Sequence, residues 1–217
     1  MKPFILWDFD GTLYRGNRPF TIYSSMILDL MGMEDSGEVR EIERRLTDYD
    51  HFYGNDGYEI VARMFPSAPP SVMQAAYEGM REVLLQHPEY VEVPVEIRRI
   101  LERGMGKCTM ILASNSPEPY VTPFLEELNL DVYFDNIISR AQKPQGVKKI
   151  IGELPESADL ISIGDHYVND IIPAAELGKD TAFISRYQGD RKIATFTGNE
   201  IEDISPEING WIEKKSQ

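Results

Sequence analysis

The chain has 217 residues, of which 42% are hydrophobic, and a formal net charge of −14. This length suits one large domain or a domain with an inserted module, and no apolar run approaches the roughly 20 residues that a membrane helix needs. The negative charge disfavours broad contact with nucleic acid or anionic lipid, so we expect neither nucleic acid nor a membrane as a partner.

The first predicted strand is the apolar run FILW, residues 4–7. It runs directly into two acids instead of continuing to a small-residue cleavage site, so it does not resemble a secretion signal. The single cysteine, Cys108, lies in the apolar run CTMILAS and is expected to be a buried small hydrophobe. These features indicate a cytoplasmic protein.

The next segment is helical in pattern and has almost no strand signal. Apolar spacing predicts four amphipathic helices, separated by stretches of Gly, Pro, Asp and Ser. They cover residues 21–32, 39–46, 58–65 and 71–85. We expect residues 15–94 to form a helical cap that is inserted into a core of residues 1–14 and 95–217.

The remainder of the chain alternates between short β-rich runs and helical patterns. After a helix predicted over residues 94–104, the runs are residues 109–114, 134–139, 160–165 and 181–185, and a final helix is predicted near residues 204–215. Such alternation predicts βα units with a parallel sheet, and the run at residues 4–7 belongs with them by character. The predicted fold class is therefore α/β, with a parallel sheet and an inserted α-helical domain.

Two acids follow the first strand in the segment DFDGTLY. Asp8 is ionised at neutral pH and can attack phosphorus without a separate base. Asp10, two residues on, can protonate a leaving alkoxide and later activate water, provided that it is protonated part of the time. The alternative is a simple turn, because aspartate and Asp-Gly are common in turns.

The second and third candidate segments follow later strands. In ILASNS, Ser114 and the amide of Asn115 could hold phosphate oxygens, or one of them could cap the helix that begins near Pro117. In RAQKPQG, Lys143 could place a compact cation on the phosphate and the nucleophile, or it could simply be solvated.

The fourth segment is ISIGDHYVND, in which Asp165 ends an apolar strand and Asp170 lies about one helical turn further on. Magnesium takes octahedral oxygen ligands, usually one or two carboxylates, a phosphate oxygen and waters, and Asp8 and Asp165 could supply the carboxylates. The alternative is a helix N-cap with a first-turn acid. Because all four segments sit at the carboxyl ends of predicted strands, where open α/β sheets bind ligands, their convergence favours one site.

These four segments resemble the signature motifs of the haloacid dehalogenase-like superfamily, a Rossmann-like group made up mainly of phosphatases. The resemblance implies that Asp8 is the nucleophile and that Asp10 is the general acid/base and also gives magnesium its backbone carbonyl. It implies that Ser114 and Lys143 bind phosphate and that Asp165 ligates magnesium. Asp170 would be a further ligand or an anchor for the ligands.

We therefore expect a magnesium-dependent phosphatase that acts on a small phosphorylated metabolite through an aspartyl-phosphate. A phosphomutase would use the same residues and protect the intermediate from water by tighter closure, and a non-catalytic phosphoacceptor or binding protein is the third reading. Substrate choice is expected to lie in the cap, where a role for four side chains competes with plain packing or exposure. These are Tyr49, His51, Phe52 and Tyr53. The substrate and the oligomeric state stay open at this level.

Overall fold

The computed structural model describes residues 1–48, 54–186 and 193–217. The chain forms two compact units. The core unit comprises Met1–Arg15 and Val93–Gln217, and the helical unit comprises Gly16–Glu92. Across the described ranges, every helix is too short or too polar to cross a bilayer.

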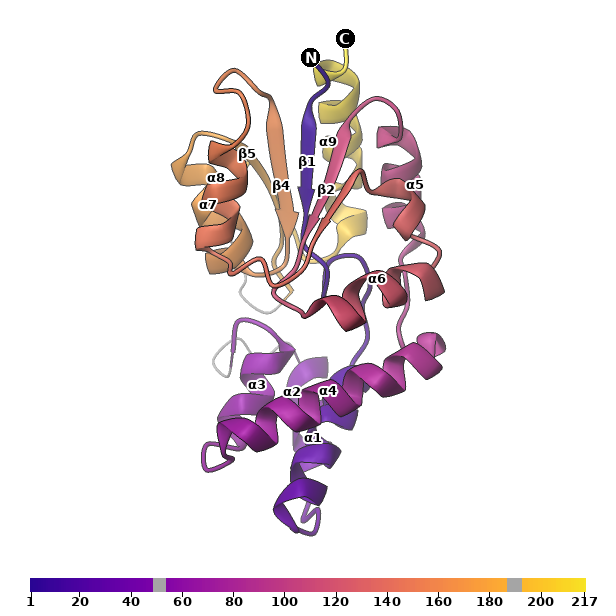
Figure 1. Ribbon diagram of the computed structural model, residues 1–217, viewed down its shortest axis with the longest axis vertical. Coiled ribbons are helices and arrows are strands. Elements are labelled where there is room, and N and C mark those ends of the chain that lie inside the picture. The colour runs from indigo at the N-terminus through magenta and orange to yellow at the C-terminus, as the bar shows by residue number, and fades with distance from the viewer. Residues whose placement is uncertain (49–53, 187–192) are drawn as a thin grey trace. The chain divides into compact units, whose positions relative to one another are not determined.

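The core unit is built on a six-stranded parallel sheet with the order β3-β2-β1-β4-β5-β6 (Figure 1). The strands are β1 (Phe4–Trp7), β2 (Thr109–Ala113), β3 (Asn136–Ile138), β4 (Leu160–Gly164), β5 (Asp180–Ile184) and β6 (Phe196–Gly198). β1 lies between β2 and β4, with Leu6 opposite both Ile111 and Ser162. The predicted Rossmann-like α/β fold is confirmed, and the helical unit is inserted between two neighbouring strands.

Helices cover both faces of the sheet. They are α5 (Val95–Gly104), α6 (Glu118–Glu127), α7 (Gln145–Gly152), α8 (Ile172–Glu176) and α9 (Ile201–Lys215). On one face Leu6 and Ile111 pack with Val147 of α7 and Ala174 of α8. On the other face Gly104 of α5 lies against Ile5 and Met110, and α9 packs beside α5. Strands that are buried on both faces need apolar residues throughout, which is why they read as continuous apolar runs.

The single cysteine belongs to this apolar interior. Cys108 directly precedes β2 and is 2% exposed. Burial raises the pKa of its thiol to about 11, and the charges of Lys107 and Lys2 only partly oppose this rise. The thiol is therefore protonated at neutral pH, in agreement with the expectation of a small buried hydrophobe.

Two features of the core unit were not expected from the sequence. β6 is only three residues long and contains Gly198, so it is too short to show strand periodicity, and it is stabilised by pairing with β5 and packing on α9. A π-helical turn, η3 (Tyr167–Ile171), precedes α8 where the sequence reads as the start of an ordinary helix. Such wide turns are frequently found at functional sites.

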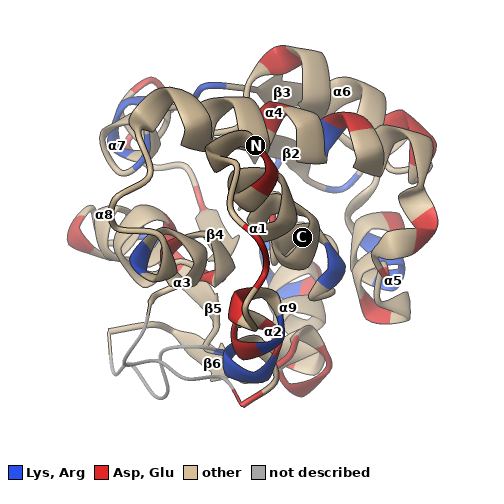
Figure 2. Cartoon of the chain, turned by 90° about the horizontal axis from the view of Figure 1, so that it is seen from below, with Lys and Arg blue, Asp and Glu red and all other residues tan. Residues whose placement is uncertain are grey.

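The helical unit contains the four predicted helices, α1 (Arg18–Met31), α2 (Glu38–Thr47), α3 (Gly57–Met64) and α4 (Pro70–Gln86). Their apolar faces form a buried interior that includes Ile27, Ile42, Ile60 and Met80. On α2 two acids, Glu38 and Glu41, lie in the first turn and two arginines, Arg44 and Arg45, lie in the last turn, which complements the helix dipole. Figure 2 shows that acidic residues occur on helices of both units with Lys and Arg among them.

A buried arginine organises one side of this helical interior. Arg81 is 1% exposed and donates hydrogen bonds to the hydroxyls of Tyr77 (2.9 Å) and Tyr58 (3.0 Å). Its guanidinium also lies over both rings. Burial and the neighbouring Tyr77 raise the pKa of Tyr23 to about 12. The cluster is thus a satisfied polar network inside an apolar interior.

Candidate active site

The carboxyl edge of the sheet gathers side chains from four loops of the core unit. Asp8 directly follows β1, Ser114 follows β2, and Asp165 follows β4. Lys143 lies in the loop between β3 and α7. Because all these strands are parallel, their ends meet at one edge even though the residues are far apart in the sequence.

Lys143 joins two of the acids. Its Nζ donates to Oδ1 of Asp8 and to Oδ1 of Asp170, the latter at 2.7 Å. The Lys143 side chain is only 4% exposed, so the interpretation of a merely solvated loop lysine was wrong. Thr12 donates its hydroxyl to the other oxygen of Asp8 at 3.1 Å. The Asp8 carboxylate is therefore held on both oxygens.

The ionisation of this group depends on burial and on mutual charge. Burial lowers the pKa of Lys143, but Asp170 and Asp8 outweigh that effect and hold the pKa above its ordinary value. Burial raises the pKa of Asp170, the Asp8 carboxylate raises it further, and Lys143 opposes the rise. The ammonium of Lys143 therefore stays charged at neutral pH, between acids that repel each other.

Asp8, Asp165 and Asp170 could together hold a metal ion. All three are buried, and each offers a carboxylate oxygen such that the oxygens lie within 4.8 Å of one another. Lys143 contacts two of these carboxylates, Asp8 and Asp170, and a divalent cation would add positive charge where the three carboxylates crowd together. A donor set made only of carboxylate oxygens suits a hard cation such as magnesium rather than zinc.

Two glycines make room for these acids. A Cβ added to Gly11 would lie 2.1 Å from Oδ2 of Asp165, and Gly11 also has a φ of +77°. A Cβ added to Gly164 would lie 2.5 Å from the Cβ of Asp170. The close approach of the loop after β1 to the end of β4 thus depends on the missing side chain of Gly11.

Asp10 has a different set of contacts from Asp8. Its carboxylate is half-buried and accepts a hydrogen bond from Tyr14 on one oxygen and from Ser116 at 2.9 Å on the other. Asp10 and Tyr14 also pair through their backbones. The segment DFDGTLY is therefore more than a simple turn, because Asp10 also accepts a hydrogen bond from the loop after β2.

The loop after β2 does not cap a helix with its polar side chains. α6 begins at Glu118 with Pro117 as its N-cap residue, so the capping interpretation of Ser114 and Asn115 was wrong. Ser114 is 2% exposed, and its Oγ accepts the backbone N–H of Ser116 at 3.0 Å. Asn115 is exposed and accepts the backbone N–H of Lys143 at 2.8 Å, which joins the second loop to the third.

The segment after β4 agrees only in part with the alternative of a helix N-cap followed by a first-turn acid. The N-cap residue of η3 is His166, whose Nδ1 accepts the N–H of Asn169 at 3.3 Å, so Asp165 is not the cap. Asp170 does lie in the first turn. Its other oxygen accepts the backbone N–H of His166 at 3.1 Å, which fixes this carboxylate between a backbone donor and Lys143.

Three residues of this edge were missed by the sequence interpretation: Thr12, Tyr14 and Ser116. All three lie within the segments DFDGTLY and ILASNS. Their place in these segments could have marked them as candidates, but the sequence does not show which side chains they contact. The four residues considered for substrate choice lie outside the described residues. These are Tyr49, His51, Phe52 and Tyr53.

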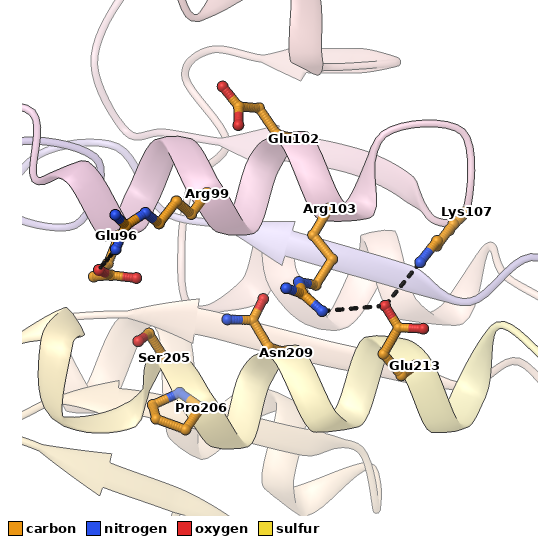
Figure 3. A pocket seen from close by; sticks show the side chains of 9 residues that line it. All are labelled: Glu96, Arg99, Glu102, Arg103, Lys107, Ser205, Pro206, Asn209 and Glu213. Atoms are coloured by element: carbon orange, nitrogen blue, oxygen red, sulfur yellow. Dashed lines mark hydrogen bonds and ion pairs between the residues drawn. The ribbon is translucent and has the colours of Figure 1, made fainter.

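A groove of about 730 Å³ lies between α5 and α9 of the core unit (Figure 3). Among its lining residues, Glu213 pairs with Arg103 (3.4 Å) and Lys107 (2.7 Å). Its lining mixes acids and cations and includes none of the four loop segments. This groove is therefore separate from the candidate site residues at the carboxyl edge of the sheet.

The sequence profile of the haloacid dehalogenase-like hydrolases matches residues 4–178. The chain therefore belongs to the haloacid dehalogenase-like hydrolase family. No protein with a curated description matches it at a significant level. The particular relatives are consequently solved structures, and their resemblance is one of fold.

Three solved structures illustrate that resemblance. The hydrolase YfnB of Bacillus subtilis, solved with magnesium, has a TM-score of 0.67 at 13% identity, covering 96% of this chain and 99% of its own. A Clostridium difficile protein described as a phosphatase has a TM-score of 0.66 at 18% identity, with coverages of 95% and 98%. A Haemophilus somnus protein described as a predicted phosphoglycolate phosphatase has a TM-score of 0.63 at 14% identity, with coverages of 95% and 97%.

Proposed function

We propose that this hydrolase is a magnesium-dependent phosphatase that cleaves a small phosphorylated metabolite through an aspartyl-phosphate on Asp8. The observation that carries the proposal is the buried carboxylate of Asp8, held by Lys143 and Thr12 at the edge where Asp165 and Asp170 also converge. The descriptions of the similar structures as phosphatases, and the magnesium in one of them, support it.

In this proposal Asp8 and Asp165 hold the magnesium ion, together with the backbone carbonyl of Asp10 and with Asp170 as a further ligand or anchor. The donor set meets the requirement of magnesium for hard oxygen ligands. When bound, magnesium supplies positive charge that draws a phosphate group toward Asp8. The phosphate oxygens are proposed to be bound from the loops after β2 and β3, by Ser114, Asn115 and Lys143.

The first half-reaction transfers the phosphoryl group to the protein. A carboxylate oxygen of Asp8 attacks phosphorus and forms a new P–O bond, while the bond from phosphorus to the leaving oxygen breaks. The electron pair of the broken bond stays on the leaving oxygen, which takes a proton from the Asp10 carboxyl group. Lys143 keeps Asp8 in place and faces the negative charge of the phosphoryl group.

The second half-reaction restores Asp8. The Asp10 carboxylate, having lost its proton, accepts one from a water molecule as the water oxygen bonds to phosphorus. The P–O bond to Asp8 then breaks, its electron pair returns to the carboxylate, and inorganic phosphate leaves. The proton on Asp10 is thereby restored, so the cycle consumes only the ester and water.

The helical unit, which is inserted in the sequence after the β1 segment, is proposed to be a cap that selects the substrate. Nothing in the described ranges favours a phosphomutase or a non-catalytic phosphoacceptor, so neither is proposed. The cytoplasmic location stays a prediction. A panel of phosphorylated metabolites, with release of inorganic phosphate as the measurement, would identify the preferred substrate.

The decisive experiment is hydrolysis of p-nitrophenyl phosphate by Asp8→Asn. We expect turnover to be abolished, because the amide cannot act as the nucleophile, whereas Asp10→Asn should reduce turnover with binding largely kept. Asp131→Asn is the matched control, since Asp131 precedes β3 at the opposite edge of the sheet. Undiminished turnover by the Asp8 variant would refute the mechanism.

A further inference from the structure

The carboxyl group of Asp10 is bracketed by two hydroxyl groups from different loops. Tyr14 donates to Oδ1, and Ser116 donates to Oδ2 at 2.9 Å. Asp8 accepts hydrogen bonds from a different pair of side chains, Thr12 and Lys143. The hydroxyls of Tyr14 and Ser116 therefore act on the second acid of the first loop.

The Tyr14 hydroxyl is placed by the apolar interior. The Tyr14 ring is 4% exposed and makes edge-to-face contacts with Phe9 and Phe124, both at 5.3 Å between ring centroids. Such contacts favour particular ring orientations, so the hydroxyl at the end of the ring has little freedom. The backbone pairing of Tyr14 with Asp10 fixes the starting points of both side chains.

The Ser116 hydroxyl is placed by hydrogen bonds of its own backbone. Its N–H donates to Oγ of Ser114 at 3.0 Å, and its carbonyl accepts the N–H of Arg140 at 2.9 Å. Ser116 is 6% exposed, so this arrangement is buried. The loops after β1 and β2 consequently meet at the Asp10 carboxyl group, and the loop after β3 holds the backbone of Ser116.

We propose that Tyr14 and Ser116 are positioning residues that hold the Asp10 carboxyl group in the orientation needed for proton transfer to the leaving oxygen. The inference rests on the proposed function, in which Asp10 is the general acid/base. Proton transfer requires the two heavy atoms to come within about 2.6–3.2 Å, and small misplacements of a catalytic group are costly. Loss of either hydroxyl would let the half-buried carboxyl group turn without disturbing Asp8.

The test compares two esters that differ in their need for an acid. The p-nitrophenolate group leaves readily without a proton, whereas phenolate is a stronger base and depends more on protonation. We expect Tyr14→Phe and Ser116→Ala each to lower kcat/KM for phenyl phosphate about 10-fold, a part of the roughly 100-fold or more that a general acid contributes. For p-nitrophenyl phosphate the same ratio should change by less than about 2-fold, since attack by Asp8 is unaffected.

Two further variants make the result interpretable. Tyr133→Phe removes a tyrosine hydroxyl elsewhere in the core unit and should change neither ratio. Asp10→Asn should separate the two esters more strongly than either hydroxyl variant. Tyr14→Phe keeps the ring that packs on Phe9 and Phe124, and Ser116→Ala provides an independent second variant.

Suppose that Asp10→Asn lowers kcat/KM more for phenyl phosphate than for p-nitrophenyl phosphate. The inference is then overturned if Tyr14→Phe and Ser116→Ala lower kcat/KM equally for both esters or for neither. If Asp10→Asn itself fails to separate them, the assignment of Asp10 as the acid is wrong, and the inference falls with it. A wild-type protein that hydrolyses neither ester would contradict the proposed function as a whole, and with it this inference.

Discussion

Lys143 shows how tightly the charges at the strand edge are linked. Its side chain is 4% exposed and contacts both Asp8 and Asp170. Because the pKa of this lysine is raised in the folded protein, its stabilising effect is fully present below the unfolded pKa of about 10.4. That effect would be lost only as the pH rises through the folded pKa, well above neutrality.

Lys143→Met should therefore destabilise the core unit in metal-free buffer. Removing one partner of a buried ion pair leaves uncompensated charge and costs about 3–5 kcal/mol, so the free energy of unfolding should fall by about that amount at pH 7. The loss should be smaller at pH 5, because the raised pKa of Asp170 lets it take up a proton. Urea denaturation measures both values.

The control for this change is Lys148→Met. Lys148 pairs with Glu176 at 2.7 Å, but both side chains are about half exposed. Exposed pairs contribute roughly 0–1 kcal/mol, so this variant should be nearly as stable as the wild type. Equal effects of the two lysine variants would contradict the view that burial makes Lys143 important.

Gly11→Ala should displace the Asp165 carboxylate, in addition to the stability lost by placing alanine at a positive φ. The added Cβ would lie 2.1 Å from Oδ2 of Asp165. Gly106→Ala is the matched control, because Gly106 has a φ of +76° against +77° at Gly11, and nothing lies within 4 Å of its added Cβ. Both should pay the left-handed backbone cost of about 1–2 kcal/mol.

Only Gly11→Ala should in addition weaken magnesium binding, because Asp165 must move. Calorimetric titration with magnesium chloride measures the affinity, and denaturation measures the stability. Unchanged magnesium affinity in the Gly11 variant would show that Asp165 can shift at no cost to the site.

At the scale of elements, the start of α9 is linked to the loop after β1, which carries Asp8. Glu200 forms a reciprocal capping box with Asp203. It also accepts hydrogen bonds from Arg186 (3.0 and 2.6 Å) and Arg15 (3.3 Å), and Arg186 donates to the carbonyl of Gly11 at 3.3 Å. One carboxylate thus joins the last helix, the end of β5 and the first loop.

Glu200→Gln should lower stability in a pH-dependent way. Burial raises the pKa of Glu200, but Arg186 and Arg15 outweigh it and hold the pKa below its ordinary value. A lowered folded pKa gives stability that is present above the unfolded pKa of about 4.3 and is lost as the pH falls through the folded pKa. We expect a loss of about 1–2 kcal/mol at pH 7, discounted for partial exposure, and a smaller loss at pH 3, which is below the unfolded pKa.

Urea denaturation at the two pH values tests this expectation. Glu202→Gln is the control, since Glu202 also pairs with Arg15 but is more exposed and lies outside the capping box. A difference between Glu200→Gln and wild type that persists unchanged at pH 3 would show that the carboxylate charge is not its cause.

At the scale of the whole molecule, the acids of the proposed metal site all belong to the core unit, and none belongs to the helical unit. The chain as a whole carries a net charge of −14. A divalent cation that binds only the folded core unit stabilises it by mass action and relieves the repulsion among its buried carboxylates.

Magnesium should therefore raise the melting temperature of the core unit. At a concentration 100 times Kd the stabilisation is about 2.7 kcal/mol, and a domain of this size gains about 2–4 °C per kcal/mol. Calorimetry with magnesium chloride, against sodium chloride of equal ionic strength, measures the shift. Asp165→Asn should lose most of it, and a melting curve that magnesium leaves unchanged would count against the metal site.

The sequence by itself determined strands β1 to β5, the four helices between Gly16 and Glu92, and the acids and lysine of the four loops. It could do so because periodicity, turn residues and strand-end position are local signals. Strand β6 and the π-helical turn escaped, since three residues show no period and a wider turn has no distinct apolar spacing.

Only the tertiary structure decided how these residues are used. The order of the strands placed Asp8 beside Asp165, and burial turned a loop lysine into a charged link between two acids. The contacts of Asp10 with Tyr14 and Ser116 depend on ring packing and on loops that meet after folding. Desolvation and hydrogen-bond geometry are properties of the assembled chain, so no local pattern of residues encodes them on its own.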